Sequence, residues 1–584
     1  MPPDAAPSIT ARRVRPEIVE QLVREGVAPI LARICAARGV TSARDLASEF
    51  EQLAAPDSML NLRKMAALLA GAIASRRKLL IVADYDADGA TACAVGMRAL
   101  RAFGAAVEYL VPNRFEYGYG LSPEIVRLAH AQFRPDVLVT VDNGIASFEG
   151  VAEAARLGME VLITDHHLPG DRLPAATCII NPNQPGCGFP SKHLAGVGVM
   201  FYLMLALRAE LRERGAFANP PNPPLPKGGV RSAGGFEPNL AELLPLVSLG
   251  TVADVVALDH NNRILVQQGL NRIRAGRMQP GIAALFEVAE REPARATARD
   301  LGFIVAPRLN AAGRLTDMAL GIECLVTDDA ERARSIATDL DRLNRERRAI
   351  ESSMSGDAAA AIEARQFDDS CTLTLFDPAW HQGVVGIVAG RIKDRFHRPV
   401  IAFARGNPGE IRGSGRSIPA LHLRDALDRV AVLNPGLILK FGGHAAAAGL
   451  TLRESEFERF QRAFEQTAQS LLAPTDLERV IETDGTLAVE ELTPETIALL
   501  SAPVWGQGFP APRFCDEFEV TAQRVVGERH LKLTLERAGK SINAIRFNFA
   551  DEAPARIRAV YQPALNEYSG RISVELAIEH WEPA

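Results

Sequence analysis

Three aspartates at alternating positions, Asp84, Asp86 and Asp88, form the densest candidate for chemistry in the sequence. They follow residues 79–83, which have the composition of a buried strand, and they precede a small-residue stretch that predicts a helix over residues 90–103. Carboxylates at this point lie at the carboxyl edge of a parallel sheet, where ligands bind in α/β folds. Because close carboxylates repel one another, a hard divalent cation among them is the simplest explanation.

The alternatives for this stretch are a solvated turn and a calcium-binding loop. A calcium loop can begin with the same alternation of aspartates, but it needs a Glu at its twelfth position. Counted from Asp84, the twelfth residue is Val95, which excludes calcium binding of that kind. A solvated Asp-rich turn stays open on this stretch alone.

The same placement recurs further along the chain. Asp142 ends the run VLVTVD, Asp165, His166 and His167 end the run VLITDHH, and Asp254 follows LVSLGTVA. Because the ends of parallel strands meet at one edge of a sheet, these side chains are expected to converge with the first three aspartates. The repetition predicts one mixed metal cluster made of Asp84, Asp86, Asp88, Asp142, Asp165, His166, His167 and Asp254.

The expected ligand set favours particular metals and a particular reaction. Oxygen ligands with one or two imidazoles suit Mn²⁺ or Mg²⁺, and without Cys ligands Zn²⁺ is a weaker candidate. More carboxylates than one ion requires indicate two ions that share a bridging Asp. Two such ions lower the pKa of a bound water and clamp a phosphoryl group during in-line displacement. The residues therefore predict hydrolysis of a phosphoester.

The composition is that of an ordinary globular protein. The chain has 584 residues, of which 47% are hydrophobic and 23% charged, and this length suffices for roughly three or four domains. The formal net charge is −6, so any nucleic-acid surface would have to be a local patch. The seven cysteines include no C-x-x-C pair, which argues against zinc ribbons and a disulfide framework and predicts a reducing cytoplasm.

No targeting or membrane-spanning segment is expected. The first residues, MPPDAAPSITARRVRP, lack the apolar core of a signal peptide. The longest uncharged apolar run, residues 194–207, is 14 residues long and is too short to span a bilayer. This run predicts a buried helix.

Alternating strand and helix patterns predict a parallel, helix-flanked sheet. The expected strands are residues 79–83, 106–111, 136–141, 160–164 and 177–180. The expected helices lie near residues 90–103, 122–132 and 147–157. A stretch rich in Pro and Gly, residues 216–238, is expected to be a flexible surface insertion between two helices.

A long polar helix is predicted from Thr327 to about Ala364, with Thr327 or Asp328 as its cap. Its apolar stripe is narrow and its other faces are charged, which is typical of a helix that bridges two domains. A second α/β domain is expected from a strand near Cys371 to about residue 470. From about residue 478, β-rich segments alternate with turns, which predicts a small antiparallel barrel.

The barrel region carries a candidate nucleic-acid surface. Between Arg513 and Arg546, Lys and Arg outnumber Asp and Glu by seven to five. The aromatic residues among these charges are Phe514, Phe518, Phe547 and Phe549. This interleaving suits a single-strand groove, and it is equally compatible with core aromatics beneath a solvated face. The candidates for contacting a nucleic-acid backbone, with salt-sensitive binding, are Arg513, Arg524, Arg529, His530, Lys532 and Arg546.

In combination, these stretches resemble a known enzyme family. VADYDADGATA, VDNG, TDHH and GTVADVV look like the four motifs of the DHH phosphoesterase superfamily. The stretches that are similar to the bacterial RecJ single-stranded-DNA exonucleases are PNRFEYGYG (112–120), PRLNAAGR (307–314), GHAAAAG (443–449) and WGQGFPAPRF (505–514). The resemblance covers nearly the whole chain from about residue 60, and the insertion 216–238 interrupts none of its motifs.

The resemblance implies an α/β architecture of several domains. A parallel-sheet DHH domain would be joined by a long bridging helix to a smaller α/β DHH-associated domain, and a C-terminal OB-like β-barrel would follow. The expected ranges are 1–60 for an N-terminal helical segment, 61–326 for the catalytic domain, 327–365 for the bridging helix, 366–470 for the DHH-associated domain and 478–584 for the barrel.

The activity implied by the resemblance is stepwise 5′→3′ removal of mononucleotides from single-stranded DNA, in DNA repair and recombination. It would depend on two Mn²⁺ or Mg²⁺ ions. A single-strand-binding protein and a helicase are the expected protein partners, and a cytoplasmic monomer without membrane contact is the expected state. The direction of cleavage rests on the resemblance alone.

Motif matches also assign roles to the cluster. The metal ligands would be Asp86, Asp88, Asp142, His166 and Asp254, with Asp84 close by and Asp142 as the candidate bridge. His167 is expected beside the site, either as a ligand or in contact with the scissile phosphate. Asp165 is expected to fix the tautomer of an imidazole. Catalysis is thus assigned to Asp142, Asp165 and His167.

Phosphate binding is expected from polar residues in the matched motifs, namely Arg114, Tyr119, Asn310, Arg314, Ser414, Arg416 and His444. Glycines beside them let backbone N–H groups approach a phosphate closely. The long helix would hold the second domain opposite the metal site, which would leave a cleft that admits single strands and excludes duplex.

Two other functions stay open. Relatives in the same superfamily hydrolyse pyrophosphate or very short and cyclic nucleotides, and those enzymes need no nucleic-acid-binding barrel. Other relatives have lost their metal ligands and act as scaffolds in replication complexes. All ligand positions are filled in this sequence, which argues against a scaffold.

Overall fold

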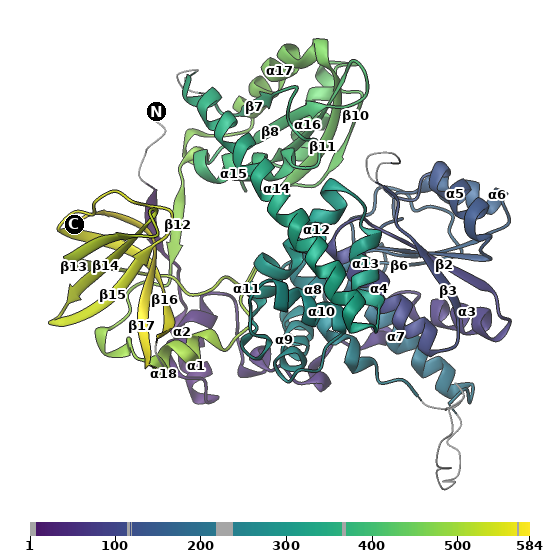
Figure 1. Ribbon diagram of the computed structural model, residues 1–584, viewed down its shortest axis with the longest axis horizontal. Coiled ribbons are helices and arrows are strands. Elements are labelled where there is room, and N and C mark those ends of the chain that lie inside the picture. Colours follow the sequence, from purple (N-terminus) through teal and green to yellow (C-terminus); the bar gives the residue numbers. More distant parts are fainter. Residues whose placement is uncertain (1–6, 114–116, 118–119, 218–236, 365–369, 569–570) are drawn as a thin grey trace, which may run out of the picture. The chain divides into compact units, whose positions relative to one another are not determined.

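The structure is a computed structural model that describes residues 7–113, 117, 120–217, 237–364, 370–568 and 571–584 (Figure 1). The chain divides into two compact units. The first, here called the sheet unit, contains Glu17–Asn344 and Ser501–Ala511. The second, here called the barrel unit, contains Met1–Pro16, Arg345–Leu500 and Pro512–Ala584. Arg114, Tyr119 and most of the predicted insertion 216–238 lie outside the described residues.

The sheet unit is built on five parallel strands in the order β3-β2-β4-β5-β6. Their bounds are Lys78–Ala83 for β2, Ala106–Leu110 for β3, Val137–Val141 for β4, Glu160–Thr164 for β5 and Cys178–Ile180 for β6. All five predicted strands are confirmed, with ends that differ by at most one residue. Alternating strand and helix patterns therefore specify this sheet well.

Helices cover both faces of the parallel sheet (Figure 1). Successive side chains of a strand point to opposite faces. Accordingly, Leu79 and Ile81 of β2 pack with α3, α4 and α7, whereas Leu80 and Val82 pack with α5 and α6. These helices span Leu62–Ala74 (α3), Ala87–Ala102 (α4), Pro123–Phe133 (α5), Phe148–Arg156 (α6) and Gly196–Glu213 (α7). The buried helix predicted from residues 194–207 is α7.

The rest of the sheet unit is helical. The bounds are Pro16–Arg24 (α1), Pro29–Ala36 (α2), Leu244–Ala253 (α8), His260–Arg274 (α9), Pro280–Val288 (α10), Ala298–Asp300 (α11), Ala306–Leu315 (α12) and Ala319–Val326 (α13). A π-helical turn, Leu301–Val305, leads into α12. The prediction of helix alone for the first 60 residues was wrong at one point, because β1 (Ser8–Ala11) pairs in parallel with β12 (Val480–Thr483). A partner so distant in the chain leaves no local sequence pattern.

The predicted long helix is α14, Ala330–Ala364, which has 35 residues and continues from the sheet unit into the barrel unit. Its apolar stripe is buried as expected at Ile336, Leu340 and Leu343. Neither predicted cap is used, because the Asp329 carboxylate accepts hydrogen bonds from the N–H groups of the first turn.

The barrel unit contains a second five-stranded sheet in the order β10-β11-β9-β8-β7. β7 and β8 are parallel, and the other neighbours are antiparallel. The strands are Leu373–Phe376 (β7), Val400–Arg405 (β8), Glu410–Arg416 (β9), Lys440–Gly443 (β10) and Ala447–Arg453 (β11), and the helices are Val385–Phe396 (α15), Leu423–Leu433 (α16) and Phe457–Gln469 (α17). The predicted second α/β region is thus present.

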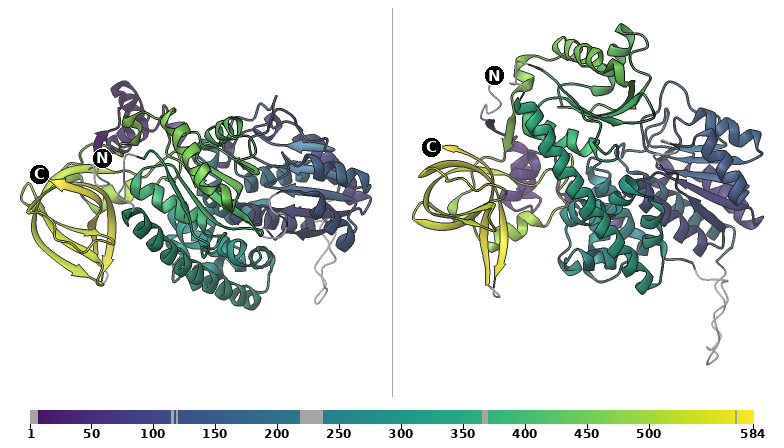
Figure 2. Two further views of the ribbon diagram at one scale, coloured as in Figure 1. Left: turned by 90° about the horizontal axis from the view of Figure 1, so that it is seen from above. Right: turned by 45° about the horizontal axis from the view of Figure 1, so that its top comes forward.

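A closed barrel of five strands ends the chain (Figure 2). The strands are Phe514–Val526 (β13), His530–Arg537 (β14), Lys540–Arg546 (β15), Arg556–Tyr568 (β16) and Arg571–Pro583 (β17). The predicted antiparallel pairing holds for all neighbours except β15 and β17, which are parallel. The segment before Phe514 contributes β12, α18 (Pro494–Ser501) and Ser501–Ala511 rather than barrel strands.

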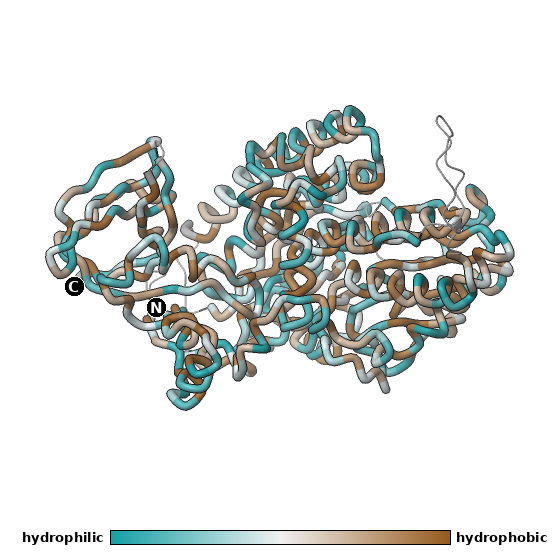
Figure 3. Tube along the Cα trace, turned by 90° about the horizontal axis from the view of Figure 1, so that it is seen from below, coloured by the Kyte–Doolittle hydropathy of each residue, from teal (hydrophilic) through white to brown (hydrophobic). Residues whose placement is uncertain are grey.

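Apolar and polar residues alternate along the chain in both units (Figure 3). Strands β2, β4, β5 and β6 of the parallel sheet are almost wholly buried, whereas the edge strand β3 is largely exposed or half-buried and β14 alternates between buried and half-buried positions. Within the described residues, no helix has the length and apolar character needed to cross a membrane.

Candidate active site

Three aspartates stand at the carboxyl edge of the parallel sheet because each directly follows a strand. Asp84, Asp142 and Asp165 follow β2, β4 and β5. Each one extends the sheet by one further hydrogen bond, from Asp84 N to Val141 O (3.3 Å), from Asp142 N to Thr164 O (3.1 Å) and from Asp165 N to Ile180 O (3.1 Å). The ladder therefore places the three residues side by side, as the sequence predicted.

Asp86 and Asp88 enter the site from the first turn of α4. The Asp86 carboxylate caps this helix by accepting from Asp88 N and Gly89 N, each at 3.0 Å. The Asp88 carboxylate accepts from Gly196 N (2.6 Å) and Val197 N (2.9 Å) at the start of α7. Two helix N-termini, which favour negative charge, thus hold these carboxylates.

Asp254 reaches the site from a different kind of element than predicted. It is the C-cap of helix α8 and does not follow a strand. The apolar run before it is buried over most of its length, and a short buried run cannot be assigned to helix or strand by periodicity. The position of Asp254 at the site was predicted, but the reason given for it was wrong.

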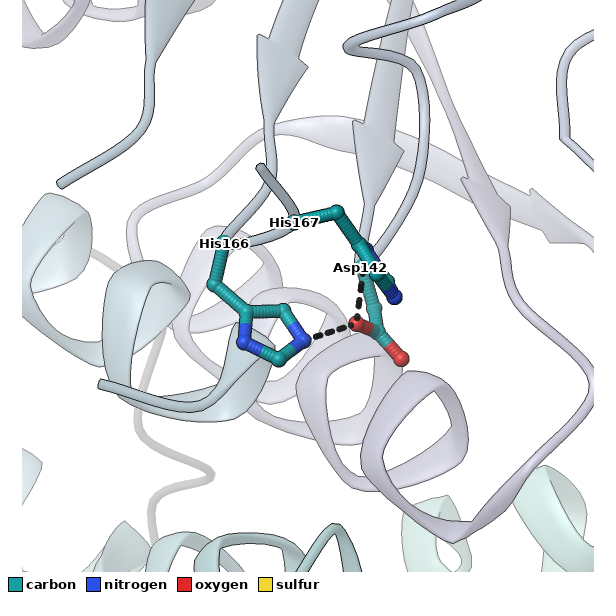
Figure 4. A group of neighbouring side chains, drawn as sticks. All are labelled: Asp142, His166 and His167. Carbon is teal, nitrogen blue, oxygen red and sulfur yellow. Dashed lines mark ion pairs between the residues drawn. The ribbon is translucent and has the colours of Figure 1, made fainter. Parts of the chain in front are cut away.

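In the described part of the chain, side-chain atoms that could hold a metal ion form three groups, in each of which the ligand atoms lie within 4.8 Å of one another. The groups are Asp84 with Asp86 and Asp142, Asp88 with His166 and Asp254, and Asp142 with His166 and His167. They merge into one cluster because Asp142 and His166 each belong to two groups. Figure 4 shows the third group, in which both imidazoles face the same carboxylate oxygen of Asp142.

The donor atoms of this cluster fit a divalent cation. His166 Nε2 lies 3.0 Å from Asp142 Oδ1, 3.5 Å from Asp254 Oδ2 and 3.9 Å from Asp88 Oδ2. Both His166 Nε2 and Asp254 Oδ2 are buried, and neither has a hydrogen bond to any described residue. Buried polar atoms are nearly always satisfied, so a bound ion is the natural partner for this pair.

The charges of the cluster also require a cation. Burial raises the pKa of Asp88 to about 7, and the charge of Asp254 acts in the same direction. Burial and the charge of Asp86 raise the pKa of Asp254 to about 7. Burial, followed by the charge of Asp88, raises the pKa of Asp142 well above its ordinary value. A bound divalent ion would reverse these shifts by favouring the ionised carboxylates.

Metal binding should therefore depend on pH in a defined direction. A carboxyl group whose pKa rises on folding stabilises the metal-free protein fully below about pH 4, and this contribution is lost as the pH rises through about 7. Bound ions need the ionised carboxylates. The rise in melting temperature caused by saturating Mg²⁺ should thus be larger at pH 8 than at pH 5.5, as measured by calorimetry against protein in EDTA. An equal rise at both pH values would contradict this account.

Asp165 positions the two imidazoles and lies behind the metal-binding groups. Its Oδ1 accepts hydrogen bonds from His166 N (2.7 Å), His167 N (3.0 Å) and His167 Nδ1 (2.7 Å). Its Oδ2 accepts from Ile145 N (2.9 Å). Burial alone would raise the pKa of Asp165, but the hydrogen bond from His167 and the charges of the two imidazoles lower it.

The two imidazoles differ in charge because their surroundings differ. Burial, followed by the charge of His167, lowers the pKa of His166, which suits a neutral metal ligand. Burial would also lower the pKa of His167, but its hydrogen bond to Asp165 and the charge of that residue raise it to about 9. In the metal-free protein His167 is therefore a cation held beside the cluster.

One predicted phosphate-binding motif lies against the aspartate loop. Asn310 Oδ1 accepts a hydrogen bond from Ala87 N (2.9 Å), so this side chain supports the start of α4. A Cβ atom on Gly313 would lie 2.0 Å from Tyr85 O, which explains why glycine is needed there. Arg314 follows in the same helix, α12, and is half-buried. The structure thus brings Asn310 to the start of α4, where it supports the scaffold of the cluster, whereas the role of Arg314 stays a prediction.

Three further predicted phosphate-binding residues belong to the barrel unit, namely Ser414, Arg416 and His444. Ser414 and Arg416 are neighbours on β9, and Arg416 Nη1 donates to Ser414 Oγ (3.3 Å) and to Gly415 O (2.8 Å). His444 is exposed in the turn that leads into β11, the strand that pairs with β9. A Cβ atom on Gly386, at the start of α15, would lie 2.7 Å from Ser414 Oγ. Ser414 and Arg416 thus lie in contact, and His444 lies in the turn before the neighbouring strand.

The barrel residues divide between core and surface. Phe514 and Phe518 are buried in the barrel, so the alternative of core aromatics holds for both, whereas Phe547 is exposed. Arg546 lies 3.9 Å from the ring centroids of both Phe549 and Trp581. Of the residues predicted to contact a nucleic-acid backbone, Arg513 forms an ion pair with Glu579, and Lys532 forms one with Glu575. Arg524 and Arg529 are exposed. The ring of His530 contacts that of Phe547 edge-on.

Several features of the site were not predicted from the sequence. The amides of Gly196 and Val197 hold Asp88, and a Cβ atom on Gly196 would lie 2.8 Å from Asp142 Cβ. Asn181 and Asn183 hold the carbonyl groups of the two histidines. The only signal for the first feature is a glycine at the start of an apolar helix, and a lone glycine does not identify its distant neighbour.

Comparison with known proteins places this geometry among described families. The chain matches the family models for the DHH family, N-terminal domain (residues 78–224), the DHHA1 domain (residues 368–470) and the RecJ OB domain (residues 483–580). It is 49% identical to the single-stranded-DNA-specific exonuclease RecJ of Dickeya dadantii over 98% of this chain and 99% of the relative. Identity to the protein of that name from Escherichia coli is 48%, over 95% of this chain and 96% of the relative.

A solved structure resembles the whole chain. The crystal structure of RecJ in complex with Mn²⁺ from Thermus thermophilus aligns with a TM-score of 0.80 and 29% sequence identity. The alignment covers 99% of this chain and 80% of that one. A structure of exonuclease RecJ bound to manganese aligns with a TM-score of 0.57 and 33% identity, over 71% of this chain and 96% of that one.

Proposed function

The chain belongs to the RecJ family of single-stranded-DNA-specific exonucleases, and on that premise we propose that it removes mononucleotides stepwise from the 5′ end of single-stranded DNA. The reaction is hydrolysis of a phosphodiester bond, and it depends on two Mn²⁺ or Mg²⁺ ions. The direction of cleavage, the dependence on metal and the assignment of residues are part of this proposal.

The observation that carries the proposal is that Asp142 belongs to one group of ligand atoms with Asp84 and Asp86 and to another with His166 and His167, while His166 also belongs to the group of Asp88 and Asp254. Asp84, Asp86 and Asp142 would hold one ion. Asp88, His166 and Asp254 would hold the other, with Asp142 Oδ1 as the bridge because it lies 3.0 Å from His166 Nε2. When bound, two such ions activate water and offset the charge of the scissile phosphate.

The remaining residues of the site orient and bind. Asp165 accepts a hydrogen bond from His167 Nδ1, and the Nε2–H of the protonated ring would donate to a phosphate oxygen. The side chain of His167 is 28% exposed, whereas that of Asp165 is 1% exposed, so substrate reaches only the former. We assign Asp142 and His167 to catalysis and Asp165 to the positioning of His167.

The phosphate groups of the bound strand are assigned to Asn310, Arg314, Ser414, Arg416 and His444, and also to Arg114 and Tyr119, which lie outside the described residues.

The proposed domain ranges are 61–326 (catalytic), 327–365 (bridging helix), 366–470 (DHH-associated) and 478–584 (OB-like), after an N-terminal segment 1–60. The OB-like region would bind the strand through Arg513 and the hairpin of β13 and β14, where Arg524 lies opposite Lys532 and Arg529 is in the turn.

Removing cations from this hairpin should weaken DNA binding in a salt-dependent way. A variant that lacks one cation bound to a DNA phosphate releases fewer counterions, so the slope of log K against log salt should fall by about 1. Arg524→Ala and Arg529→Ala should each show this change, measured as the affinity of EDTA-treated protein for a fluorescent single strand at several salt concentrations. Arg63→Ala, which removes an exposed ion-paired cation from the sheet unit, should leave the slope unchanged. An unchanged slope in both hairpin variants would exclude this hairpin from DNA binding.

The proposed activity is tested with an oligonucleotide labelled at one end. With Mn²⁺, a 5′ label on a single strand should appear early as a labelled mononucleotide, whereas a 3′ label should stay on long products until late. A blunt duplex of the same sequence should resist digestion. Shortening from the 3′ end would overturn the direction. Turnover of dinucleotides or pyrophosphate without cleavage of the oligonucleotide would overturn the exonuclease and favour a small-molecule substrate.

The cellular setting is also a proposal, and family membership is its only support. The enzyme would act in DNA repair and recombination in the cytoplasm, as a monomer, on strands supplied by a helicase and covered by a single-strand-binding protein. Sedimentation of the purified protein tests the monomer directly, and a dimer at micromolar concentration would contradict it.

A further inference from the structure

A short segment from the C-terminal part of the sequence is built into the sheet unit. Ser501–Ala511 belongs to that unit, although the chain on either side of it belongs to the barrel unit. Its core is the turn Trp505–Pro510, here called the aromatic clamp. Nothing in the activity proposed above uses this turn, and its contacts lie beside a candidate metal ligand.

The aromatic clamp is a compact turn with internal bonds of its own. The rings of Trp505 and Phe509 stack with centroids 4.9 Å apart and an interplanar angle of 16°. Gly506 and Phe509 exchange backbone hydrogen bonds, at 2.9 Å from Gly506 N and 3.1 Å from Phe509 N. Arg38 fixes the turn from outside, with its guanidinium 5.4 Å from the Trp505 ring and its Nε donating to Pro510 O at 2.7 Å.

The clamp docks on the loop that follows Asp254. Gln507 O accepts a hydrogen bond from Leu258 N at 2.7 Å. The guanidinium of Arg263 lies 4.3 Å from the Phe509 ring, and its Nη1 donates to Leu258 O at 2.8 Å. Both backbone groups of Leu258 are thus fixed, one by the clamp itself and the other by an arginine that packs on the clamp.

The loop itself needs external support. Val255, directly after Asp254, has a φ of 62°, a left-handed conformation that strongly disfavours a β-branched residue. Its side chain gains little from packing, because it is 62% exposed. Strained backbone of this kind persists only where the surrounding structure holds it. The hydrogen bonds at Leu258, three residues further along, supply such a hold.

We propose that the aromatic clamp is a positioning element for Asp254. By fixing residues 255–258 it keeps Asp254 at the end of α8, with Oδ2 3.5 Å from His166 Nε2. This inference rests on the proposed function and extends it. Trp505–Pro510 would determine how tightly the site formed by Asp88, His166 and Asp254 binds a metal ion. The clamp acts through Asp254 and touches neither substrate nor metal.

A matched pair of glycine variants tests the contact. Gly508 has a φ of +72°, and a Cβ atom there would lie 2.9 Å from Ala257 Cβ and 3.4 Å from Ala257 Cα. Gly276, in the same unit, has a φ of +71°, and a Cβ atom there would meet nothing within 4 Å. Gly508→Ala and Gly276→Ala therefore carry the same backbone strain, and only the first pushes on the loop.

The readout is Mn²⁺ affinity by titration calorimetry on the full chain, with the circular dichroism spectrum as the check on folding. The binding step that is present in the wild type and lost in Asp254→Asn is the one that belongs to the Asp254 site, and its affinity is the quantity compared. Gly508→Ala should weaken that site by at least about tenfold, the usual effect of a residue that supports a ligand. Gly276→Ala should bind Mn²⁺ like the wild type.

A double variant identifies the route of the effect. If the clamp acts through Asp254, adding Gly508→Ala to Asp254→Asn should cause no further loss of Mn²⁺ affinity. Equal affinities in the two glycine variants, or additive losses in the double variant, would overturn the proposal. If Gly508→Ala fails to fold, Trp505→Leu replaces it, with Trp505→Phe expected to restore affinity because it keeps the stacked ring.

The outcome is separable from that of the proposed function. A wild type that binds Mn²⁺ but leaves single strands intact would refute the exonuclease, and the calorimetric comparison would still decide the role of the clamp. A wild type that digests single strands, together with glycine variants of equal affinity, would refute the clamp alone.

Discussion

Replacing Asp142 by Asn should nearly abolish nucleotide release and should make the metal-free protein more stable. The activity falls because, among the residues that the structure describes, Asp142 is the carboxylate that belongs to two ligand groups. Charge stabilisation by metal ions is worth several kcal/mol, which corresponds to a loss of about a thousandfold. Stability rises because burial and the charge of Asp88 hold the pKa of Asp142 well above normal, so folding the metal-free protein must either bury an unfavourable charge or protonate this carboxyl, and an amide avoids both costs.

The substitution suits the backbone at this position. Asp142 has a φ of 61°, which Asn accepts more readily than other side chains do, so the fold should be preserved. Asp136→Asn is the matched control, because Asp136 directly precedes the same strand, β4, at the opposite edge of the sheet and is exposed. The measurements are the rate of release from a single strand with Mn²⁺ and the melting temperature in EDTA. A variant with normal activity, or a lower melting temperature in EDTA, would show that Asp142 is structural.

Replacing Asp165 by Asn should lower both activity and stability, in contrast to the change at Asp142. The buried carboxylate accepts four hydrogen bonds, including that from His167 Nδ1 at 2.7 Å. An amide at this position has only one acceptor oxygen and would turn an NH₂ group towards donors. Residues that orient a ligand in this way change activity by about 10–100-fold, so a loss of that size is expected.

The stability effect of Asp165→Asn has a defined pH window. In the metal-free protein the pKa of His167 is raised to about 9, so the pair contributes stability fully below the ordinary His pKa and loses it as the pH rises through about 9. The pKa of Asp165 is lowered, so its contribution is lost as the pH falls through the acid range. The difference in unfolding free energy between wild type and variant should thus be largest between about pH 4 and pH 6.5 and smaller at pH 10. An NMR titration should show the pKa of His167 falling in the variant, and an unchanged pKa would contradict the assigned pair.

The strand ends of the site were predictable because they follow from local patterns. Five apolar runs separated by helical patterns specify a parallel sheet, and its geometry places Asp84, Asp142 and Asp165 at one edge without further information. Asp254 was assigned to the same edge for a reason that the structure contradicts. Its apolar run is a buried helix, and a helix that is buried all round has no periodic stripe to distinguish it from a strand.

The support of the site could not be predicted, because it comes from residues far apart in the chain. Asp88 is held by the amide of Val197, 109 positions away. Leu258 is held by a hydrogen bond to Gln507, which lies 249 positions further along the chain. Neither contact leaves a pattern in the residues near it. In the barrel, alternation predicted the strands but could not tell that Phe518 faces the core, because an aromatic residue fits either face of a strand.

The central claim is that the Asp and His cluster holds two metal ions that share Asp142. The most direct test is anomalous diffraction at the manganese edge from crystals of the protein grown with Mn²⁺. The account predicts two anomalous peaks, one against Asp84, Asp86 and Asp142 and the other against Asp88, Asp142, His166 and Asp254. A single peak, or two peaks of which only one contacts Asp142, would contradict the shared centre.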